Sequence, residues 1–221
     1  MQVKKSIIVV AGGKGLRMGG PIPKQFVLLK GTPILMRTID QFTQVFPDIK
    51  VIVVLPAEQV SYWKKLCLAH DFGAAHQIAI GGNTRFHSVE NGLALVKEGV
   101  VGIHDAVRPL VSKETIERCF KEAQKEGNAV PFIPINDSIR KVNGQQNHQV
   151  DRDEFKIIQT PQVFQASTIK DAFKQGFQNS FTDDASVLEA SNKSINLVEG
   201  NFENMKITTP SDLKIAEYWI N

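Results

Sequence analysis

Residues 7–20 read Ile-Ile-Val-Val-Ala-Gly-Gly-Lys-Gly-Leu-Arg-Met-Gly-Gly, an apolar run that passes directly into a glycine-rich segment. The apolar run Ile7–Ala11 predicts a buried strand, and the glycines after it let the backbone turn sharply and approach a ligand closely. Consecutive backbone N–H groups in such a loop bind phosphate, and Arg17 adds a guanidinium that can hold an anion at two points. This stretch therefore predicts a strand that ends in an anion-binding loop.

Apolar runs and amphipathic segments alternate along the rest of the chain. Runs of Val, Ile and other apolar residues predict buried strands at 51–55, 77–80, 100–104, 129–135 and 195–198. Apolar residues at helical spacing predict helices near 35–46, 60–67, 86–96, 112–123, 167–176 and 210–220, the fourth with Ser112 as its N-cap. Such strands, alternating with such helices, imply a parallel sheet that is covered on both faces. We expect an α/β fold.

Length and composition narrow the class of protein. The chain has 221 residues, of which 26 are Lys or Arg and 23 are Asp or Glu, for a net charge of +3. At about 150 residues per domain this is a single domain, residues 1–221, and so small a charge does not indicate a nucleic-acid partner. The longest apolar runs are far shorter than the ~20 residues of a membrane-spanning helix. Cys67 and Cys119 stand in apolar helical patterns, which is typical of reduced thiols. We expect a cytoplasmic protein without a nucleic-acid or membrane partner.

The alternation stops between residues 136 and 158. This stretch contains Asn143-Gly144 between alternating segments, which is a signal for a β-hairpin. The polar run at 145–149 leaves it too few apolar side chains to bury a core of its own. We therefore expect residues 136–158 to form a β-hairpin arm that projects from the domain, with an irregular solvated loop as the alternative.

The glycine-rich loop fits neither of two common nucleotide-binding patterns. A Walker loop requires Gly-x-x-x-x-Gly-Lys-Ser/Thr, which this loop lacks. A dinucleotide fingerprint requires a glycine where Met18 stands, and the second strand ends in Val54-Leu55-Pro56 without an acid to hold a ribose. A nicotinamide-dependent oxidoreductase is therefore disfavoured. A glycine turn without a ligand is disfavoured as well, because Arg and Lys in such a loop indicate an anion.

Lys24 is a second candidate cation for the same anion. It follows Pro23 in a stretch with two prolines, which stiffen the backbone and so restrict where the ammonium can lie. A lone lysine is more often a solvated surface charge. The spacing of seven residues from Arg17, across a rigid connection, favours a shared ligand.

Two more groups of residues follow predicted strands at the edge where ligands of open parallel sheets bind. Asp105 and Arg108 come at the carboxyl end of the strand at 100–104, although an acid and a base three apart can also form a purely local salt bridge. Residues 81–85, followed by Ser88, form a strand-to-helix turn that suits a base or a ribose.

Taken together, the order of these motifs resembles a known family. Between residues 6 and 220 the chain reads Ala-Gly-Gly-x-Gly-x-Arg-Met, Pro-Lys-Gln, Gly-Gly-x-x-Arg, His-Asp-Ala-x-Arg-Pro, Thr-Pro-Gln, Thr-Asp-Asp-Ala and Lys-Ile-Thr-x-Pro-x-Asp-Leu. In this order the motifs resemble the 2-C-methyl-D-erythritol 4-phosphate cytidylyltransferases of the non-mevalonate isoprenoid pathway. The resemblance implies a Rossmann-like nucleotidyltransferase domain with a mostly parallel sheet and a β-arm through which a homodimer forms.

The resemblance also implies a role for individual residues. Those that would be catalytic are Arg17, Lys24 and Lys206. Those that would bind CTP are Ala11, Gly12, Gly13, Gly15, Gly82, Asn83, Ser88 and Ala106. Those that would bind the methylerythritol phosphate are Asp105, Arg108, Arg152, Thr160 and Thr182. Of these, Arg152 and Thr160 would reach the substrate phosphate in the partner subunit.

The implied reaction joins CTP to a polyol phosphate and releases diphosphate. The attacking phosphate oxygen is already anionic and needs no general base, which agrees with the lack of a Ser-His-Asp pattern. Fixed cations and Mg²⁺, held mainly by the CTP phosphates, would counter the repulsion between the two substrates. The histidines and cysteines show no zinc spacing, so we expect no metal site among them, and the sequence identifies no particular protein ligand for Mg²⁺.

Two further functions stay open at the level of sequence. A ribitol 5-phosphate cytidylyltransferase would share the loop and the arm, and spacing alone does not separate it from the first reading. A non-catalytic CTP-binding dimer is disfavoured because Arg17, Lys24 and Lys206 are all present.

Overall fold

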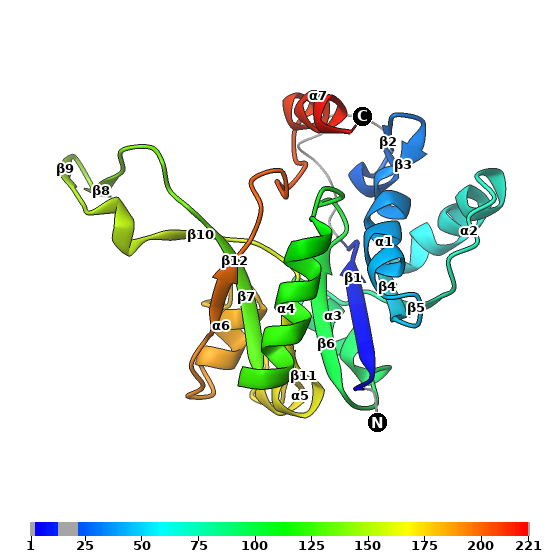
Figure 1. Ribbon diagram of the computed structural model, residues 1–221, viewed down its shortest axis with the longest axis horizontal. Coiled ribbons are helices and arrows are strands. Elements are labelled where there is room, and N and C mark those ends of the chain that lie inside the picture. Colours follow the sequence, from blue (N-terminus) through cyan, green and yellow to red (C-terminus); the bar gives the residue numbers. More distant parts are fainter. Residues whose placement is uncertain (1–2, 13–21, 221) are drawn as a thin grey trace.

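The computed structural model describes residues 3–12 and 22–220, and a mostly parallel sheet forms its centre (Figure 1). Within these ranges the strands follow the order β10-β7-β11-β6-β1-β4-β5, and β12 pairs with β7. Their bounds are β1 (Lys5–Val10), β4 (Lys50–Leu55), β5 (His76–Ile80), β6 (Val100–Asp105), β7 (Asn128–Pro134), β10 (Lys156–Ile158), β11 (Gln162–Gln165) and β12 (Leu197–Glu199). The strands predicted from apolar runs are thus present, with ends that differ by one or two residues.

The parallel arrangement is confirmed for the half of the sheet that carries the glycine-rich loop. Strand β1 pairs in parallel with both β4 and β6, and β4 pairs in parallel with β5. Strand β11 was not predicted, and it runs antiparallel between β6 and β7. It has only two apolar residues, Val163 and Phe164, between two glutamines, which is too short a run to indicate a strand.

Two hydrophobic cores lie on opposite faces of the sheet, because successive side chains of a strand point to opposite sides. Ile7 and Val9 belong to the core that includes residues of α1, α2 and α4, whereas Ile8 belongs to the core with residues of α3, α5 and α6. The helices are α1 (Ile34–Val45), α2 (Val60–Ala69), α3 (Arg85–Ala94), α4 (Lys113–Glu126), α5 (Ala166–Phe173), α6 (Asp184–Glu189) and α7 (Pro210–Trp219). The predicted sheet with both faces covered is therefore correct.

Helix ends follow local capping rules. The Ser112 hydroxyl accepts a hydrogen bond from the Thr115 backbone N–H at 3.1 Å, which confirms Ser112 as the N-cap of α4. Helix α7 begins with Pro210 after a capping box, in which the Thr209 hydroxyl and the Asp212 carboxylate each accept a backbone N–H of the other.

An exposed hairpin extends from the sheet beyond β7 and β10 (Figure 1). Its strands are β8 (Arg140–Asn143) and β9 (Gln146–Gln149), and all of their residues are exposed. The turn is Gly144-Gln145, with Gly144 at φ +60°, so it lies one residue later than the predicted Asn-Gly turn. Glycine at the first central position with positive φ is typical of a type II′ hairpin turn.

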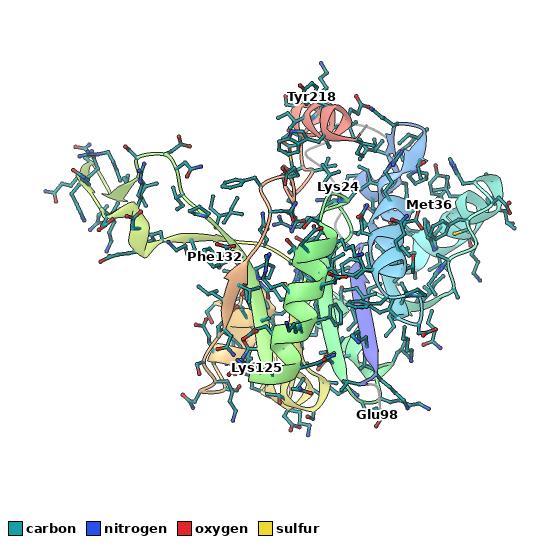
Figure 2. The ribbon with its side chains drawn as sticks, viewed as in Figure 1. Lys24, Met36, Glu98, Lys125, Phe132 and Tyr218 are labelled. Atoms are coloured by element: carbon teal, nitrogen blue, oxygen red, sulfur yellow. The ribbon has the colours of Figure 1, made fainter. Side chains whose placement is uncertain are left out.

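Short elements complete the end of the molecule at which β1, β4, β5 and β6 have their carboxyl ends. They are the 3-10 helices η2 (Lys24–Phe26) and η3 (Ala57–Gln59) and the small hairpin β2 (Leu28–Leu29) and β3 (Thr32–Pro33). Figure 2 shows Lys24 toward this end and Glu98 at the opposite end. No helix within the described ranges is long and apolar enough to cross a membrane.

Candidate active site

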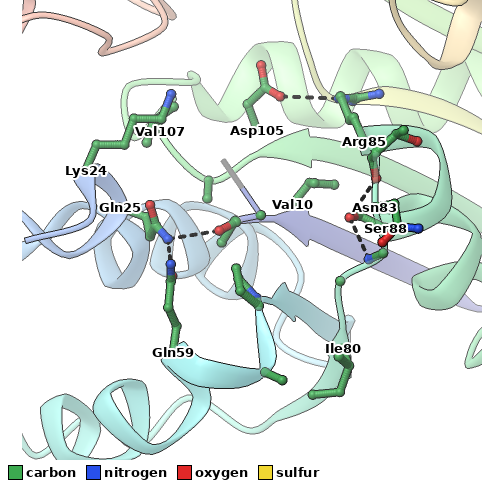
Figure 3. A pocket seen from close by; sticks show the side chains of 18 of the residues that line it. Val10, Lys24, Gln25, Gln59, Ile80, Asn83, Arg85, Ser88, Asp105 and Val107 are labelled. Carbon is green, nitrogen blue, oxygen red and sulfur yellow. Dashed lines mark hydrogen bonds and ion pairs between the residues drawn. The ribbon is translucent and has the colours of Figure 1, made fainter. Parts of the chain in front are cut away.

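A cleft of about 650 Å³ opens beyond the carboxyl ends of β1, β4, β5 and β6. This is the place where open parallel sheets bind ligands. Figure 3 shows Val10, Ile80 and Asp105 at the ends of β1, β5 and β6 around it, together with side chains from η2 and η3. The predicted site residues that line it are Ala11, Gly12, Lys24, Gly82, Asn83, Ser88, Asp105, Ala106 and Lys206. Residues from distant parts of the sequence thus come together as the motifs predicted.

The start of the glycine-rich loop is held by two hydrogen bonds at Ala11. Its backbone N–H donates to the Val54 carbonyl at 2.9 Å, and its carbonyl accepts from Gln25 Nε2 at 2.9 Å. Ala11, the residue that follows β1, is therefore fixed at the cleft. Three predicted site residues of this loop, Gly13, Gly15 and Arg17, lie outside the described residues.

The turn between β5 and α3 forms the wall opposite η2. The Ser88 hydroxyl accepts the Gly82 backbone N–H at 3.1 Å and donates to the Thr84 carbonyl at 2.9 Å (Figure 3). A Cβ atom on Gly82 would lie 2.4 Å from the Cβ atom of His87, so the turn has no space for a side chain there. Asn83 is exposed at the same turn, and it faces the cleft. Ser88 is nearly fully buried, and it holds the turn in shape beneath the cleft.

Lys24 enters the cleft from η2, whose next residue is anchored on two sides. Gln25 is buried, and its amide group donates to the Ala11 carbonyl and to Gln59 Oε1, the latter at 2.6 Å. Figure 3 shows both bonds, with the Lys24 side chain extending beside Val107. Both amide hydrogens of Gln25 are used, so this residue connects η2 to the glycine-rich loop and to η3 at once. Sequence reasoning quoted Gln25 within a motif without assigning it a role.

Asp105 is the acidic centre of the site. One of its oxygens, Oδ2, lies 3.2 Å from Arg108 Nε and 3.0 Å from Lys206 Nζ. The other, Oδ1, lies 3.8 Å from Arg85 Nε (Figure 3). Three cations thus surround one carboxylate that is only 11% exposed.

This arrangement keeps Asp105 ionised. Burial by itself raises the pKa of the Asp105 carboxyl, because a charge in the interior is poorly solvated. The surrounding cations, of which Arg85 and Lys206 act most strongly, outweigh burial and hold that pKa well below its usual range. The carboxylate therefore holds Arg85 and Lys206 on the wall of the cleft, where anionic substrates can meet them, and it also binds the more buried Arg108.

Arg85 is a site residue that sequence reasoning missed. Its guanidinium donates two hydrogen bonds to the buried Asp184, at 2.9 and 2.7 Å, in a bidentate pair. Burial alone lowers the pKa of Arg85, but the carboxylates of Asp184 and Asp105 outweigh it, so the guanidinium stays charged. The available signals were the arginine in the Gly-Gly-x-x-Arg motif and the second acid in Thr-Asp-Asp-Ala, but nothing in the sequence paired them.

Arg108 and Thr160 are in contact with this centre. The Arg108 guanidinium also donates to the Asn204 carbonyl at 2.7 Å, which ties the segment before Lys206 to the end of β6. Thr160 is buried, and its hydroxyl accepts the Asp105 backbone N–H at 3.1 Å. Both predicted residues are therefore joined to Asp105 within one subunit.

The other two predicted substrate residues lie apart from the cleft. Thr182 lines a separate hollow of about 170 Å³, with Phe177 and Phe181 among its walls and Arg85 shared with the main cleft. Arg152 belongs to the short helix η4 (Arg152–Glu154) on the arm, where its guanidinium donates to the Asn136 carbonyl. In a single subunit neither residue lines the cleft.

A cleft of this size with Lys24, Arg85 and Lys206 on its walls suits a polyanion such as a nucleoside triphosphate. Among the described residues no three His, Cys, Asp or Glu side chains gather into a metal-binding group. The fold and the cationic cleft together define a nucleotidyltransferase, an enzyme class in which positioning and electrostatics carry most of the catalysis.

Comparison with known proteins identifies the family. A family model described as 2-C-methyl-D-erythritol 4-phosphate cytidylyltransferase matches residues 6–221, and the chain belongs to this family. Two proteins of that name, from Phocaeicola vulgatus and Bacteroides fragilis, are 50% and 52% identical to this chain. The match to the Phocaeicola vulgatus protein covers 99% of this chain and 100% of that protein. The match to the Bacteroides fragilis protein covers 96% of this chain and 97% of that protein. A crystal structure of 4-diphosphocytidyl-2C-methyl-D-erythritol synthase from Anaerococcus prevotii matches with a TM-score of 0.85 at 25% identity, over 99% of this chain and 96% of that one.

Proposed function

We propose that this cytidylyltransferase joins CTP to 2-C-methyl-D-erythritol 4-phosphate in the cleft at the carboxyl edge of the sheet. A phosphate oxygen of the methylerythritol substrate forms a bond to the α-phosphorus of CTP. The bond from that phosphorus to the bridging oxygen breaks, and diphosphate leaves with the electron pair. The observation that carries the proposal is the group of cations held around Asp105 in the cleft that Ala11 and Gly12 also line, because two polyanions must meet there.

Each wall of the cleft has a part in this reaction. We assign the glycine-rich loop, including Gly13 and Gly15, to binding the triphosphate. Gly82 and Asn83 read the cytosine through the turn that Ser88 holds in shape. Ala106, at the end of β6, lies beside the ribose. Rigid walls of this kind provide the orientation on which phosphoryl transfer depends.

The charged residues divide between the two substrates. Arg17 and Lys24 stabilise the α-phosphate as it is attacked, and Lys206 receives the phosphate of the second substrate. Asp105 and Arg108 bind the hydroxyl groups of the methylerythritol. Since Lys206 and Arg108 both contact Asp105, one carboxylate positions the groups that hold the second substrate.

The reaction as proposed uses Mg²⁺ bound mainly by CTP. When bound, this ion neutralises phosphate charge and favours departure of diphosphate. The carboxylates that line the cleft are Glu58 and Asp105, and Asp105 is already surrounded by cations. This donor set fits an ion that takes most of its ligands from the triphosphate and from water.

The proposal includes a homodimer in which the arm at 136–158 completes the partner's site. Arg152 is exposed on the arm and away from its own cleft, so it can reach a substrate phosphate only in another subunit. Thr182 is assigned to the same substrate, whereas Thr160 is buried, so we assign it a supporting part behind Asp105, whose backbone N–H its hydroxyl accepts. The chain is assigned to the cytoplasm, in keeping with the free thiols of Cys67 and Cys119.

The other functions considered from sequence lose support. Membership of the methylerythritol phosphate family favours that substrate over ribitol 5-phosphate. A non-catalytic CTP-binding dimer would have no use for a further cation, Lys206, held against Asp105 in the cleft that Lys24 also lines.

The proposal is tested by diphosphate release measured with each of the four nucleoside triphosphates against both polyol phosphates. CTP with methylerythritol phosphate should be turned over much faster than any other pair. Equal turnover of ribitol 5-phosphate, or release without a polyol, would contradict the proposed substrates.

Lys24→Ala should keep the fold and lower kcat by about 10³ or more, the scale of losing a cation that acts in the transition state. The fold is checked by circular dichroism. A folded variant that keeps more than about a tenth of wild-type turnover would show that Lys24 is not such a cation.

A further inference from the structure

His104 is a fully buried histidine that comes directly before the turn at 105–108, whose first and last residues are Asp105 and Arg108. It is the residue before the end of β6, and its exposed fraction is 0%. Its Nε2 atom lies 3.0 Å from the Arg108 carbonyl oxygen, and its Nδ1 atom lies 2.9 Å from Thr160 Oγ1. The Phe42 ring packs against the imidazole in a T-shaped arrangement, with 4.9 Å between ring centroids. The ring is thus fixed by a contact on each nitrogen and by packing.

The partners of the two nitrogens determine which one carries the proton. The Arg108 carbonyl can only accept, so Nε2 must donate to it. In the neutral ring Nδ1 is then an acceptor, and the Thr160 hydroxyl donates to it. The oxygen of that hydroxyl accepts the Asp105 backbone N–H at 3.1 Å. Burial lowers the pKa of His104 to about 4, which agrees with a neutral ring.

These bonds hold both ends of one turn. The Arg108 N–H donates to the Asp105 carbonyl at 3.1 Å and closes the turn itself. His104 fixes the Arg108 end directly, and through Thr160 it fixes the Asp105 end. A small rotation of this turn would move the Asp105 carboxylate, and Lys206 is held 3.0 Å from that carboxylate.

We infer that His104 is a positioning residue for the transfer reaction, which acts through Thr160 and the Arg108 carbonyl to set the places of Asp105, Arg108 and Lys206. It does not contact substrate, and it transfers no proton. The inference rests on the proposed roles of those three residues toward the methylerythritol phosphate. It assigns the Thr160 hydroxyl to this link within its own subunit.

Three substitutions separate the two ends of the link. His104→Gln places an amide N–H near the position of Nε2, so it can keep the Arg108 bond, whereas His104→Asn reaches only as far as Nδ1 and can keep the Thr160 bond. His104→Phe keeps the ring and removes both bonds. The matched control is His76→Phe, because His76 also has a hydrogen bond on each nitrogen, to the Ala74 carbonyl and from Trp63 Nε1, but lies outside the cleft.

Kinetics should then distinguish positioning from stability. We expect His104→Phe to lower kcat/KM for the polyol phosphate by about 10- to 100-fold while KM for CTP changes by less than about threefold, because unmade buried hydrogen bonds displace the turn. His104→Gln and His104→Asn, which each keep one of the two hydrogen bonds, should lower kcat/KM for the polyol phosphate by less than His104→Phe does. His76→Phe should lower the unfolding temperature and leave both constants unchanged. His104 variants that are folded at the assay temperature and match the wild-type constants would overturn the inference.

A second measurement needs no substrate, so it fails or succeeds independently of the proposed function. Nitrogen-15 NMR of the histidine rings in the wild-type protein at neutral pH should show a neutral ring with its proton on Nε2, assigned to His104 by its loss in the His104→Gln spectrum. A charged ring or an Nδ1-protonated ring at this position would overturn the inference, even if the enzyme is active. Because this spectrum is recorded on the wild-type protein, the result does not depend on whether His104→Phe folds.

Discussion

At the scale of single residues, the site depends on groups that position others. Gln25 and Gly82 contact the cleft without contributing a charge, yet each sets where a wall of the cleft lies. Their substitution therefore tests positioning without removing a cation.

Gly82→Ala should weaken CTP binding and raise its Kd by about tenfold or more. The added Cβ atom would lie 2.4 Å from the Cβ atom of His87, so the turn at 81–84 must shift, and a shift that costs about 1–3 kcal/mol corresponds to this loss of affinity. Isothermal titration with CTP measures the effect. Gly73→Ala is the control, because nothing lies within 4 Å of a Cβ atom there. Equal CTP affinity of Gly82→Ala and wild type would show that the turn does not read the nucleotide.

Gln25→Leu should lower kcat by about 10- to 100-fold, because it leaves the Ala11 carbonyl without its donor and releases η2, which carries Lys24. Steady-state kinetics with both substrates measures this. Gln59→Leu removes only the second of the two bonds, so its effect should be clearly smaller. If Gln59→Leu is as slow as Gln25→Leu, the bond to Ala11 is not the one that positions Lys24.

At the scale of secondary structure elements, the sequence revealed the strands whose burial is uniform. β1, β4 and β6 are covered on both faces, so they contain runs rich in Val and Ile. Strand β11 was not predicted because it begins with the polar Gln162. The Gln162 side chain bonds to the start of α6, where it donates to Asp183 Oδ2 and accepts the Ala185 N–H. A polar residue whose partners lie in a distant element gives no local signal.

Partners in a distant element also explain why some site residues were predicted from the sequence and others were not. Lys24, Asp105 and Lys206 stand in recognisable motifs, and they line the cleft. The role of Arg85 comes from Asp184, 99 residues away, in a helix that packs on the same face as α3. Only the folded chain brings these two together.

Asp184→Asn tests this tie between α3 and α6. The substitution breaks the bidentate pair and leaves the Arg85 guanidinium short of a counter-charge, so we expect the free energy of unfolding to fall by about 1–3 kcal/mol, reduced from a fully buried pair because Arg85 is partly exposed. Urea unfolding followed by circular dichroism measures it. Asp171→Asn, which breaks the exposed pair with Lys174, should leave the midpoint unchanged. An unchanged midpoint for Asp184→Asn would mean that the pair does not stabilise the fold.

At the scale of the whole molecule, the cleft of one subunit does not gather every residue that the reaction is proposed to use. The cleft lies at the carboxyl edge of the sheet, whereas Arg152 stands on an arm that extends away from it (Figure 1). The exposed apolar side chains of Val142, Phe155 and Ile157 on and beside this arm are typical of a surface that another chain covers. The arm is therefore proposed to act in trans.

Mixed dimers of Lys24→Ala and Arg152→Ala test this arrangement. Each variant alone should be nearly inactive with methylerythritol phosphate at low concentration. In a mixed dimer, the subunit with intact Lys24 receives an intact Arg152 from its partner, so one of the two sites is complete. After unfolding and refolding an equal mixture, random pairing should restore about a quarter of wild-type turnover. If the arm acted in cis, no site of the mixed dimer would hold both residues and turnover would not recover. A sedimentation measurement on the wild-type protein accompanies the test, and a monomer at assay concentration would contradict the arrangement outright.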